Sequence, residues 1–535
     1  MTLLPVARID ADVAIVGSGF AGSLTALALR ARGYRVALIE RGRHPRFVIG
    51  ESSTPLANLL IEELADRYDL PGIRVFSKWG TWQRARPDVA CGLKRGFTFF
   101  FHQPGIAFPD DAERQRQLLV AASPHDDIAD THWYRPQFDQ ALAQAAEAAG
   151  AIYQDMTRLD HLRHEGDVTV LEGEREGRSV RIDARFVIDA TGPRGFLHHA
   201  LQLEERAARQ RWLPATQGLY THFEDVERWD RLRPQRGAES EPPPYPIDDA
   251  AVHHVFPGGW IWVLRFNNGI TSAGAALTDA AASAIGAVDG EAAWNRLLVM
   301  LPSVADQFRS ARAVLPFVHA PRLSFRSSRV AGTTWALLPS AAGVIDPLLS
   351  TGFPLTLLGI QRLLDVLERT SAGREREEAL RDYEHTTLAE LDATERLVAA
   401  LYATMTDPPL FKRLGLLYFA AASFSEAARR LGRPELAPGF LLSSHPAFGP
   451  ELTACATLAS SAPHGAVRQA LEDRLDCAIE PFDIAGLRDR ARRDWYPVLA
   501  SDLLASGAKL QATPDALRQL LERSGFTVLS EANRG

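Results

Sequence analysis

Residues 13–23 read VAIVGSGFAGS, an apolar run that leads directly into a glycine-rich turn. The mostly apolar stretch 12–16 is typical of a buried strand, and the alanine- and leucine-rich stretch through about Arg32 is typical of a helix. A second apolar strand follows at 35–39. This order of strand, turn, helix and strand predicts a βαβ unit whose two strands lie parallel in one sheet.

The glycines of this turn have the spacing G-x-G-x-x-G, and Glu40 ends the second strand. In such a pattern the first glycine makes the turn, the second lets a pyrophosphate approach the backbone, and the third lets helix and strand pack closely. The phosphates then lie at the positive end of the helix, and Glu40 can accept hydrogen bonds from a ribose. A purely structural turn is the alternative, but strand, helix and acidic residue together favour dinucleotide binding. The predicted contact residues are Gly17, Ser18, Gly19, Phe20, Ala21, Gly22, Glu40 and Arg41.

The composition is that of an ordinary globular protein, with 535 residues of which 46% are hydrophobic and 23% charged. A net charge of −7 argues against nucleic acid or an anionic membrane as the main partner, because both favour basic surfaces. The three cysteines lie far apart, which is typical of a reducing compartment. The sequence has neither a signal-peptide pattern nor an apolar run of the roughly 18–20 residues that a spanning helix needs. We therefore expect no transmembrane segment and a cytoplasmic location.

The character of the chain changes twice after the first unit. Residues 251–256 and 259–266 read as strands, and Asn-Asn-Gly at 267–269 is typical of a hairpin turn, so an antiparallel sheet is expected in the middle of the chain. The proline- and charge-rich segment 233–249 is predicted to be a surface loop. After residue 353 the apolar residues recur at helical spacing, which predicts helices.

Four segments together resemble flavin-dependent halogenases. Two further segments resemble FAD-contacting segments of the wider hydroxylase-like superfamily. The superfamily segments are VIDATG (187–192) and ALLPSAAGVIDP (336–347). The halogenase-like segments are IGESSTP (49–55), KRGFTF (94–99), GGWIWVLRF (258–266) and GVIDPLLSTGFPL (343–355). The resemblance spans about residues 10–400 and is nearest to the branch that acts on phenols and pyrroles.

The resemblance implies an α/β fold with a Rossmann-type FAD-binding domain, an antiparallel β-sheet substrate domain and a helical C-terminal region. We expect the FAD-binding domain over residues 1–375, with Rossmann-like parts at about 10–60, 135–200 and 330–370. The sheet region on the substrate side is interleaved at about 80–130 and 205–325, and the helical region covers 376–535.

FAD is the implied cofactor, and no second glycine fingerprint for NAD(P)H is present, so reduced FAD is expected from a separate flavin reductase. Pro339-Ser340 replaces the Gly-Asp pair that many relatives have, which puts one contact to the ribityl chain in doubt. Asp346 either orients a group near the flavin or caps a turn. The histidine pairs at 198–199 and 253–254 lack a plausible ligand set, so no metal is expected. The further cofactor contacts implied are Gly50, Ser52, Ser340, Gly343 and Asp346.

A halide site is implied where STGFPL begins a helix. We expect Thr351 to cap this helix and Gly352 and Pro354 to open it, so that free N–H groups and the positive end of the helix dipole favour chloride or bromide. A well-capped structural helix is the alternative. The implied halide-binding residues are Ser350, Thr351 and Gly352.

Lys94 matches the catalytic lysine of the resembled family, at the mouth of the aromatic strand GFTFFF. Partial burial beside Phe97, Phe99 and Phe101 is expected to lower its pKa, which brings ammonium and amine forms within reach. The ammonium can hydrogen-bond hypohalous acid, and the amine can form a haloamine. An exposed lysine at a strand end is the alternative.

Trp260 and Trp262 match the family's Trp-x-Trp signature, in which the pair walls the flavin off from the substrate chamber. Alternating tryptophans on a strand are otherwise ordinary core residues. This chain has Leu264-Arg265 where the family usually has Ile-Pro.

The sequence therefore predicts an enzyme, an FAD-dependent halogenase that uses oxygen and chloride or bromide on an electron-rich aromatic of the phenol or pyrrole type. The small aromatic substrate is either free or tethered to a carrier protein. Two alternatives stay open. One is an FAD-dependent monooxygenase that hydroxylates or epoxidises its substrate directly, and the other is a flavin-binding accessory protein without turnover.

Overall fold

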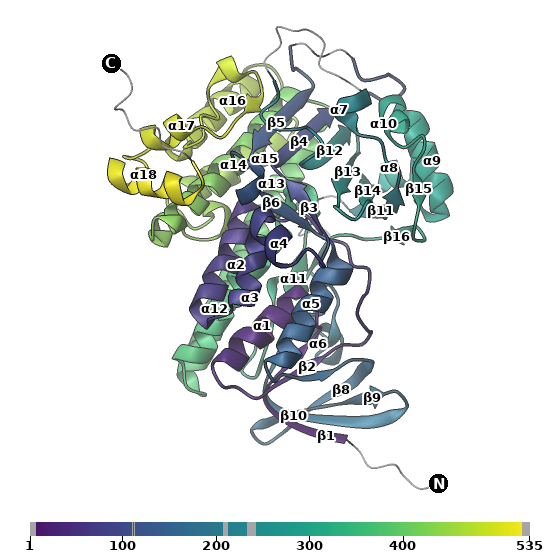
Figure 1. Cartoon of the computed structure of the whole chain (residues 1–535), viewed down its shortest axis with the longest axis vertical. Helices are drawn as coiled ribbons and strands as arrows, with labels where there is room; N and C mark the ends of the chain where they lie inside the picture. Colours follow the sequence, from purple (N-terminus) through teal and green to yellow (C-terminus); the bar gives the residue numbers. More distant parts are fainter. Residues whose placement is uncertain are drawn as a thin grey trace.

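The computed structural model describes residues 7–109, 111, 113–206, 212–213, 215–232 and 242–526. The first part of the predicted surface loop at 233–249 lies outside these residues. Figure 1 shows one sheet beside the N-terminus, a second sheet at the opposite end of the molecule, and helices between and alongside them.

The glycine-rich unit forms as predicted, with β1 (Ala7–Val16), α1 (Phe20–Ala31) and β2 (Val36–Ile39) in sequence. β1 lies parallel to β2, with Val13 opposite Val36, and parallel to β10 (Arg178–Asp189) on its other side. β18 (Trp335–Leu337) pairs with the end of β10, which completes a parallel arrangement around the turn. The sheet is extended by β7 (Ile152–Gln154), β8 (Thr157–Glu165) and β9 (Val168–Arg175) in the order β7-β2-β1-β10-β9-β8.

Helices cover this first sheet because their apolar faces pack against it. α1 packs against α5 (Arg135–Ala148), and α12 (Gly352–Arg369) packs against both α1 and α2 (Pro55–Tyr68). The turn before β18 and the short α11 (Pro339–Ala342) then lead the chain back to the glycine turn.

The second sheet has nine strands in the order β15-β11-β14-β13-β12-β4-β5-β20, with β16 beside β11. Successive side chains of a strand point to opposite faces of the sheet, so this sheet separates two hydrophobic cores. Phe97, Phe99 and Phe101 of β4 belong to the main core, and Phe100 belongs to the core on the other face. Asn267-Asn268-Gly269 makes the predicted hairpin turn between β13 and β14. The strands are β4 (Gly96–Phe101), β5 (Gln117–Ala121), β11 (Thr216–Glu224), β12 (Ala251–Phe256), β13 (Gly259–Arg265), β14 (Thr271–Thr278), β15 (Arg312–Ala313), β16 (Val318–Ala320) and β20 (Trp495–Tyr496).

Short helices cover the outer face of the second sheet, as Figure 1 shows at the upper right. They are α7 (Trp229–Leu232), α8 (Asp279–Ile285), α9 (Glu291–Met300) and α10 (Pro302–Gln307). Smaller elements join the two sheets, namely α3 (Pro71–Arg74), α4 (Trp79–Ala85), β3 (Cys91–Lys94), β6 (Asp130–Trp133), α6 (Phe196–Ala200), β17 (Phe325–Arg326) and β19 (Gly343–Val344).

The C-terminal region is mostly helical, as predicted, but it is not wholly helical. β20 pairs parallel with β5, so the C-terminal region supplies the edge strand of the second sheet. The prediction missed β20 because a strand of two residues has no periodic signal. The helices are α13 (Arg374–Ala403), α14 (Pro408–Arg430), α15 (Phe448–Ser460), α16 (Gly465–Ile479), α17 (Ala500–Ala505) and α18 (Pro514–Arg523).

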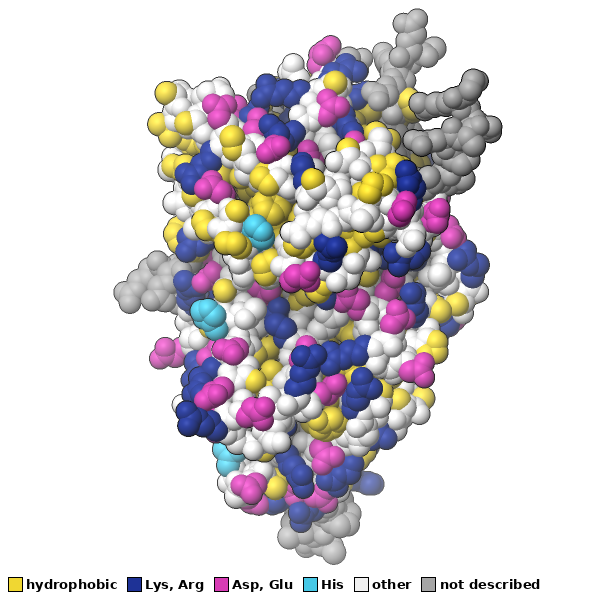
Figure 2. All heavy atoms as spheres, turned by 90° about the vertical axis from the view of Figure 1, so that its left-hand side faces the viewer, with side chains coloured by type: hydrophobic (Ala, Val, Ile, Leu, Met, Phe, Trp, Pro, Cys, Tyr) yellow, Lys and Arg dark blue, Asp and Glu magenta, His cyan; other side chains and the backbone are white. Residues whose placement is uncertain are grey.

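The fold class predicted from the sequence is confirmed, whereas the exact division at residue 375 stays a prediction. Within the described residues, every helix is too short or too polar to cross a membrane. Figure 2 shows basic and acidic side chains interspersed over one face, with apolar side chains gathered in its upper half, where Figure 1 places the C-terminal helices.

The close packing at Gly22 gives a first prediction. A Cβ at residue 22 would overlap the carbonyl oxygen of Gly17, so Gly22→Ala forces the turn and α1 apart. We expect a loss of about 1–3 kcal/mol in unfolding free energy, measured by urea unfolding followed by fluorescence. Gly72→Ala is the matched control, because no other atom lies within 4 Å of its added Cβ. Equal stability of the two variants would contradict the packing role of Gly22.

Candidate active site

The glycine turn brings the end of β1, the start of α1 and the end of β10 into contact. Gly17 has φ 102° and a Cβ there would lie 2.7 Å from the Ala190 carbonyl oxygen, so a side chain is excluded by both conformation and space. Gly19 is the residue before α1, and the atoms nearest to a Cβ added there, all from side chains, would lie 3.5 Å or more from it. The backbone at the start of α1 is therefore accessible to a ligand.

Glu40 holds this turn from the end of β2. Its carboxylate accepts hydrogen bonds from the backbone N–H of Ser18 at 3.1 Å and of Gly42 at 2.9 Å, and it pairs with Arg46 at 3.1 Å. Burial acts to raise the pKa of Glu40, but the Arg46 guanidinium and these hydrogen bonds outweigh it and hold the pKa below its usual value. Glu40 is therefore an anion at neutral pH, positioned where a ribose is bound in dinucleotide folds.

A first cavity of about 450 Å³ opens from the glycine turn. Most of the predicted site residues line it: Gly19, Phe20, Ala21, Gly50, Ser52, Trp260, Trp262, Ser340, Gly343, Asp346, Ser350, Thr351 and Gly352. Arg41 is exposed and lies outside this lining, whereas Arg46 and Arg135 belong to it. The two arginines, together with the N-terminus of α1, suit the pyrophosphate of FAD, so the residues present fit this cofactor.

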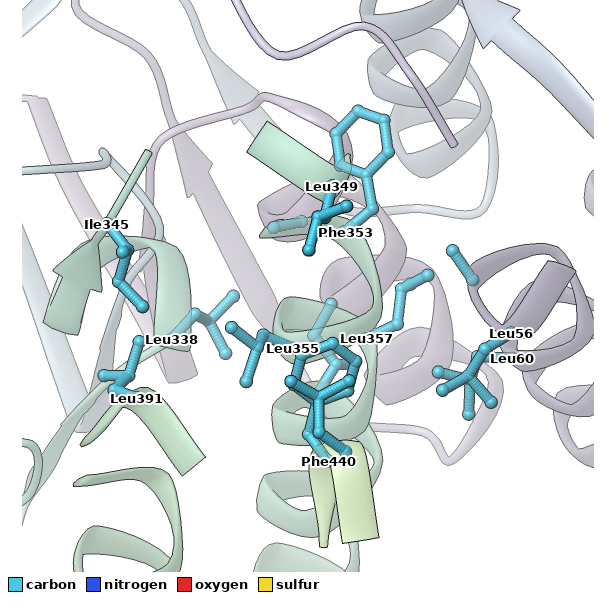
Figure 3. Close-up of a cluster of buried hydrophobic side chains, with 14 of the residues drawn as sticks. Leu56, Leu60, Leu338, Ile345, Leu349, Phe353, Leu355, Leu357, Leu391 and Phe440 are labelled. Carbon is cyan, nitrogen blue, oxygen red and sulfur yellow. The ribbon is translucent and has the colours of Figure 1, made fainter. Parts of the chain in front are cut away.

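The segment before α12 forms an unusual turn at the wall of the first cavity. Leu349 and Ser350 both have left-handed backbones, with φ 65° and 55°, a conformation that is costly for residues other than glycine. Tyr418 of α14 donates a hydrogen bond to the Leu349 carbonyl at 2.9 Å and so supports this turn. Figure 3 shows the apolar side chains that pack around it, from Leu338 and Ile345 on one side to Leu56 and Leu60 of α2 on the other.

The predicted cap at Thr351 is wrong. Thr351 has φ −73° and ψ −20°, and its side chain makes no cap hydrogen bond within the described residues. A capping residue normally has an extended backbone, and the helical backbone of Thr351 does not direct its hydroxyl toward the first turn. Gly352 begins α12 beside the cavity, and a Cβ there would meet no atom within 4 Å. The N–H groups of this first turn have no acceptor earlier in the helix, which favours an anion.

Asp346 is the centre of a buried hydrogen-bonded group. It accepts bonds from the Leu348 N–H at 3.0 Å, from Trp260 Nε1 at 3.2 Å and from Tyr402 Oη at 2.8 Å. Burial raises the pKa of Asp346 to about 6. These bonds cap the turn before α12 and fix Trp260 in the cavity wall.

Lys94 is fully buried, with 0% of its surface exposed. The segment of residues 51–53 runs along β6, and β6 pairs with β3, which brings this segment to the lysine. Lys94 Nζ donates hydrogen bonds to Ser52 Oγ at 2.9 Å and to the Ser53 carbonyl, and it lies 3.8 Å from the centre of the Phe97 ring. The alternative of an exposed strand end is therefore wrong.

Lys94 and Asp130 stand opposite each other in the β3–β6 pair and affect each other's protonation. Burial lowers the pKa of Lys94, and the Asp130 carboxylate opposes this effect. Burial also raises the pKa of Asp130, and the Lys94 ammonium opposes it. Desolvation is the dominant cause in both residues, so both amine and ammonium forms are accessible near neutral pH.

A second cavity of about 200 Å³ is bordered by Phe97, whose ring contacts Lys94. Its wall includes Thr54, Phe97, Asp130 and Pro354. Two segments therefore border both cavities. They are residues 52–54 and the first turn of α12. Lys94 contacts both walls, through Ser52 of the first cavity and through Phe97 of the second.

A row of aromatic rings connects the two walls along the second sheet. Trp260 lies 5.1 Å from His253, His253 lies 4.3 Å from Phe99, and Phe99 lies 6.5 Å from Phe97. The alternation of β13 directs Trp260, Trp262 and Leu264 toward the first cavity.

The sequence interpretation missed Arg46 and Arg135 of the first cavity and Asp130 and Tyr418 of the second. Asp130 and Tyr418 act across a long separation in sequence, whereas Arg46 pairs with Glu40 only six residues away. None of these residues stands in a motif with distinctive spacing. The basic segment RGRHPRF at 41–47 offered the one usable signal, because any of its arginines could have reached a phosphate.

Comparisons with known proteins identify the family of this chain. The family described as FAD dependent oxidoreductase matches residues 12–347. The chain is 31% identical over 409 residues to the monodechloroaminopyrrolnitrin halogenase PrnC of Pseudomonas fluorescens, which covers 74% of this chain and 68% of that protein. It is 29% identical over 424 residues to the tetracycline 7-halogenase of Kitasatospora aureofaciens, covering 77% of this chain and 73% of that protein.

The fold is also similar to solved structures. The halogenase PltM, in complex with phloroglucinol and FAD, superposes with a TM-score of 0.78 over 90% of this chain and 99% of that chain. The sequence identity is 24%, so this likeness concerns the fold.

The placement of the arginines gives a second prediction. Arg46→Gln removes a cation from the first cavity and leaves Glu40 without its ion pair, so we expect the Kd for FAD to rise about tenfold to a hundredfold. Arg41→Gln, at an exposed position outside the cavity, is the matched control and is expected to leave the Kd nearly unchanged. Fluorescence titration of the apoprotein with FAD measures both. A larger effect at Arg41 than at Arg46 would contradict this assignment.

Proposed function

We propose a specific reaction for this chain, which belongs to the flavin-dependent halogenase family within the FAD-dependent oxidoreductases. In this reaction chloride or bromide is oxidised in the first cavity, and the electrophilic halogen is transferred past Lys94 to an electron-rich aromatic ring. The observation that carries the proposal is the fully buried Lys94 amine, which contacts the walls of both cavities.

The first cavity is the proposed FAD site. The start of α1, Arg46 and Arg135 would hold the pyrophosphate, and Glu40, which holds the glycine turn behind the cavity wall, would hold the ribose. Gly50, Ser52, Ser340 and Gly343 line other parts of the cavity. When bound in reduced form, FAD supplies together with oxygen the oxidant that converts halide to hypohalous acid. Pro339, the first residue of α11, packs closely against Gly359 of α12. This packing gives a structural reason for the Pro339-Ser340 pair that replaces the Gly-Asp pair of many relatives.

The halide is proposed to bind at the start of α12, beside Ser350, Thr351 and Gly352. The N–H groups of the first helical turn provide a weak anion site, and the bare Gly352 backbone leaves space above it. The left-handed turn at Leu349 and Ser350 presents this helix start to the cavity, and the hydrogen bond from Tyr418 stabilises the turn.

Lys94 is the proposed catalytic residue. As an ammonium it donates a hydrogen bond to hypohalous acid. As an amine it attacks the halogen of hypohalous acid, so that an N–halogen bond forms, the O–halogen bond breaks and water leaves. Burial makes both forms accessible. Ser52 and Ser53 orient the nitrogen between the two cavities. Free hypohalous acid would oxidise side chains indiscriminately, so a single buried amine provides selectivity.

Trp260 and Trp262 are proposed to form the barrier at the first cavity. The hydrogen bond from Trp260 to Asp346 and the ring contacts toward Phe97 support this role. The Leu264-Arg265 pair, which stands where the family usually has Ile-Pro, does not favour a direct monooxygenase. Leu264 still lines the cavity, and Arg265 turns away from it to pair with Asp248 at 3.2 Å. Direct oxygenation and a silent accessory protein are nevertheless distinct outcomes of the experiments below.

The partners and location are part of the proposal. A separate flavin reductase would supply reduced FAD, and the enzyme would act in the cytoplasm. The substrate would be a small aromatic of phenol or pyrrole type, either free or on a carrier. Support for the carrier comes from relatives named 1H-pyrrole-2-carbonyl-[peptidyl-carrier protein] chlorinase and brominase, which are 25% and 22% identical to this chain.

Lys94→Met tests the proposal most simply, because methionine keeps the volume and apolar contacts of the side chain but removes the nitrogen. With reduced FAD, oxygen and bromide, we expect halogenated product to fall by at least about a thousandfold, which corresponds to about 4 kcal/mol of barrier, while FAD affinity and oxygen consumption are retained. Mass spectrometry of a panel of phenols and pyrroles measures the product. Lys509→Met, at a C-terminal position, is the matched control. Hydroxylated product without halide in the wild type would indicate the monooxygenase instead.

Gly352→Ala tests the halide site. The added methyl group meets no protein atom, so folding and FAD affinity should change little, but it occupies space above the helix start. We expect the KM for bromide to rise about tenfold, and more than the KM for chloride, because bromide is larger. Steady-state kinetics at varied halide concentration measure this change. Unaltered KM values for both halides would place the halide elsewhere.

A further inference from the structure

The second cavity combines an apolar wall with a few buried oxygens that have no hydrogen-bond partner in the described residues. The apolar wall includes Phe97, Phe419, Phe440 and Leu521. The oxygens are Ser77 Oγ, Ser123 Oγ and Asp130 Oδ2, on residues that are 1%, 4% and 5% exposed. All three residues line the cavity.

Such oxygens are rare in folded proteins, because a buried polar atom without a partner loses about 1–3 kcal/mol relative to one that has its bond. Asp130 shows the contrast within one side chain. Its Oδ1 accepts a hydrogen bond from Asn58 Nδ2 at 3.0 Å, whereas Oδ2 has no such partner in the described part of the chain. The three oxygens therefore indicate a site whose hydrogen bonds are completed by a bound molecule.

The charges around the cavity indicate a neutral occupant. Its wall carries two cations, Lys78 and Arg430, and two acidic groups, Asp130 and Glu426. Arg430 pairs with Glu426 at 2.7 Å, and Lys78 lies 3.5 Å from Glu62 behind the wall. Because each cation already has an acidic partner, an anionic ligand would gain no free counter-charge.

The volume indicates a small ring system. An apolar cavity of about 150 Å³ holds benzene, so a cavity of about 200 Å³ suits one or two fused rings. The aromatic rings in its wall offer edge and face contacts to such a ligand.

We propose that the second cavity binds a neutral one- or two-ring arene by a hydroxyl or amino group, which donates its hydrogen bond to Asp130 and is assisted by Ser77 and Ser123. This inference rests on the proposed function and names the residues that recognise its substrate. Asp130 and Lys94 are cross-strand partners in β3 and β6, and side chains at such positions point to the same face. A ring held at Asp130 therefore lies beside the amine that delivers the halogen.

The test measures binding alone, using the enzyme loaded with oxidised FAD and no halide. The probes are 2-naphthol, its methyl ether and 2-naphthoate, which share one ring system but differ in donor and charge. We expect 2-naphthol to bind at least about tenfold more tightly than either analogue. Equilibrium dialysis with fluorescence detection measures the three Kd values. Equal binding of the naphthol and its ether would overturn the role of the donor, and tighter binding of the naphthoate would overturn the neutral site.

Variants locate the contact. Asp130→Leu should remove the preference for 2-naphthol over its ether, and Ser77→Ala and Ser123→Ala, which delete one oxygen each, should reduce it severalfold even if Asp130→Leu does not fold. Asp167→Leu, at an exposed turn far from the cavity, is the control.

Ala422→Phe, in the cavity wall on α14, should abolish 2-naphthol binding but keep the Kd for FAD. Full binding to Ala422→Phe would place the arene elsewhere and overturn the proposal.

The binding result and the turnover result separate the two proposals. Donor-dependent binding that is lost in Ala422→Phe, without any halogenated product from the wild type, would contradict the proposed function and leave this inference standing. Halogenation that does not distinguish hydroxylated from methylated rings, and that persists in Ala422→Phe, would contradict this inference and leave the function standing.

Discussion

The site depends on one amine that is kept out of water. A buried ammonium is costly unless hydrogen bonds and an opposite charge compensate it. Lys94 receives this compensation from Ser52, Ser53, the face of Phe97 and the nearby Asp130. The same desolvation that makes burial of the ammonium unfavourable also lowers the pKa of Lys94, which makes the amine form available for the proposed chemistry.

The surrounding fold meets this requirement. Residues 51–53 run along β6 and bring hydrogen-bond acceptors to Lys94, and their continuation begins α2, which packs against α12. The first turn of α12 borders both cavities, so the proposed halide site and the lysine are positioned by the same packed elements. Tyr418, from the C-terminal region, supports the turn at Leu349 and faces the second cavity. The C-terminal helices thus complete the site as well as enclose it.

Sequence reasoning succeeded where the signal is local. The βαβ unit, the strands at 251–256 and 259–265 and the burial of Lys94 follow from periodicity, glycine spacing and motif resemblance. It failed where the outcome depends on contacts between distant segments. Asp130 acquires its role only because β6 pairs with β3, and Tyr418 acquires its role only because α14 lies beside the turn at Leu349. Arg46 was missed for a local reason, because the path of residues 41–50 decides which arginine lines the cavity. Thr351 looked like a cap, but it follows two left-handed residues and has a helical backbone of its own.

The central claim is that the halide and the aromatic ring occupy different cavities with Lys94 between them. Anomalous scattering from crystals of the FAD-loaded enzyme tests it directly, with sodium bromide soaked into one crystal and 4-bromophenol into another. The account predicts a bromide peak beside Gly352 in the first cavity and a bromophenol peak in the second, on opposite sides of the Lys94 nitrogen. Both peaks in a single cavity, or neither within reach of that nitrogen, would contradict it.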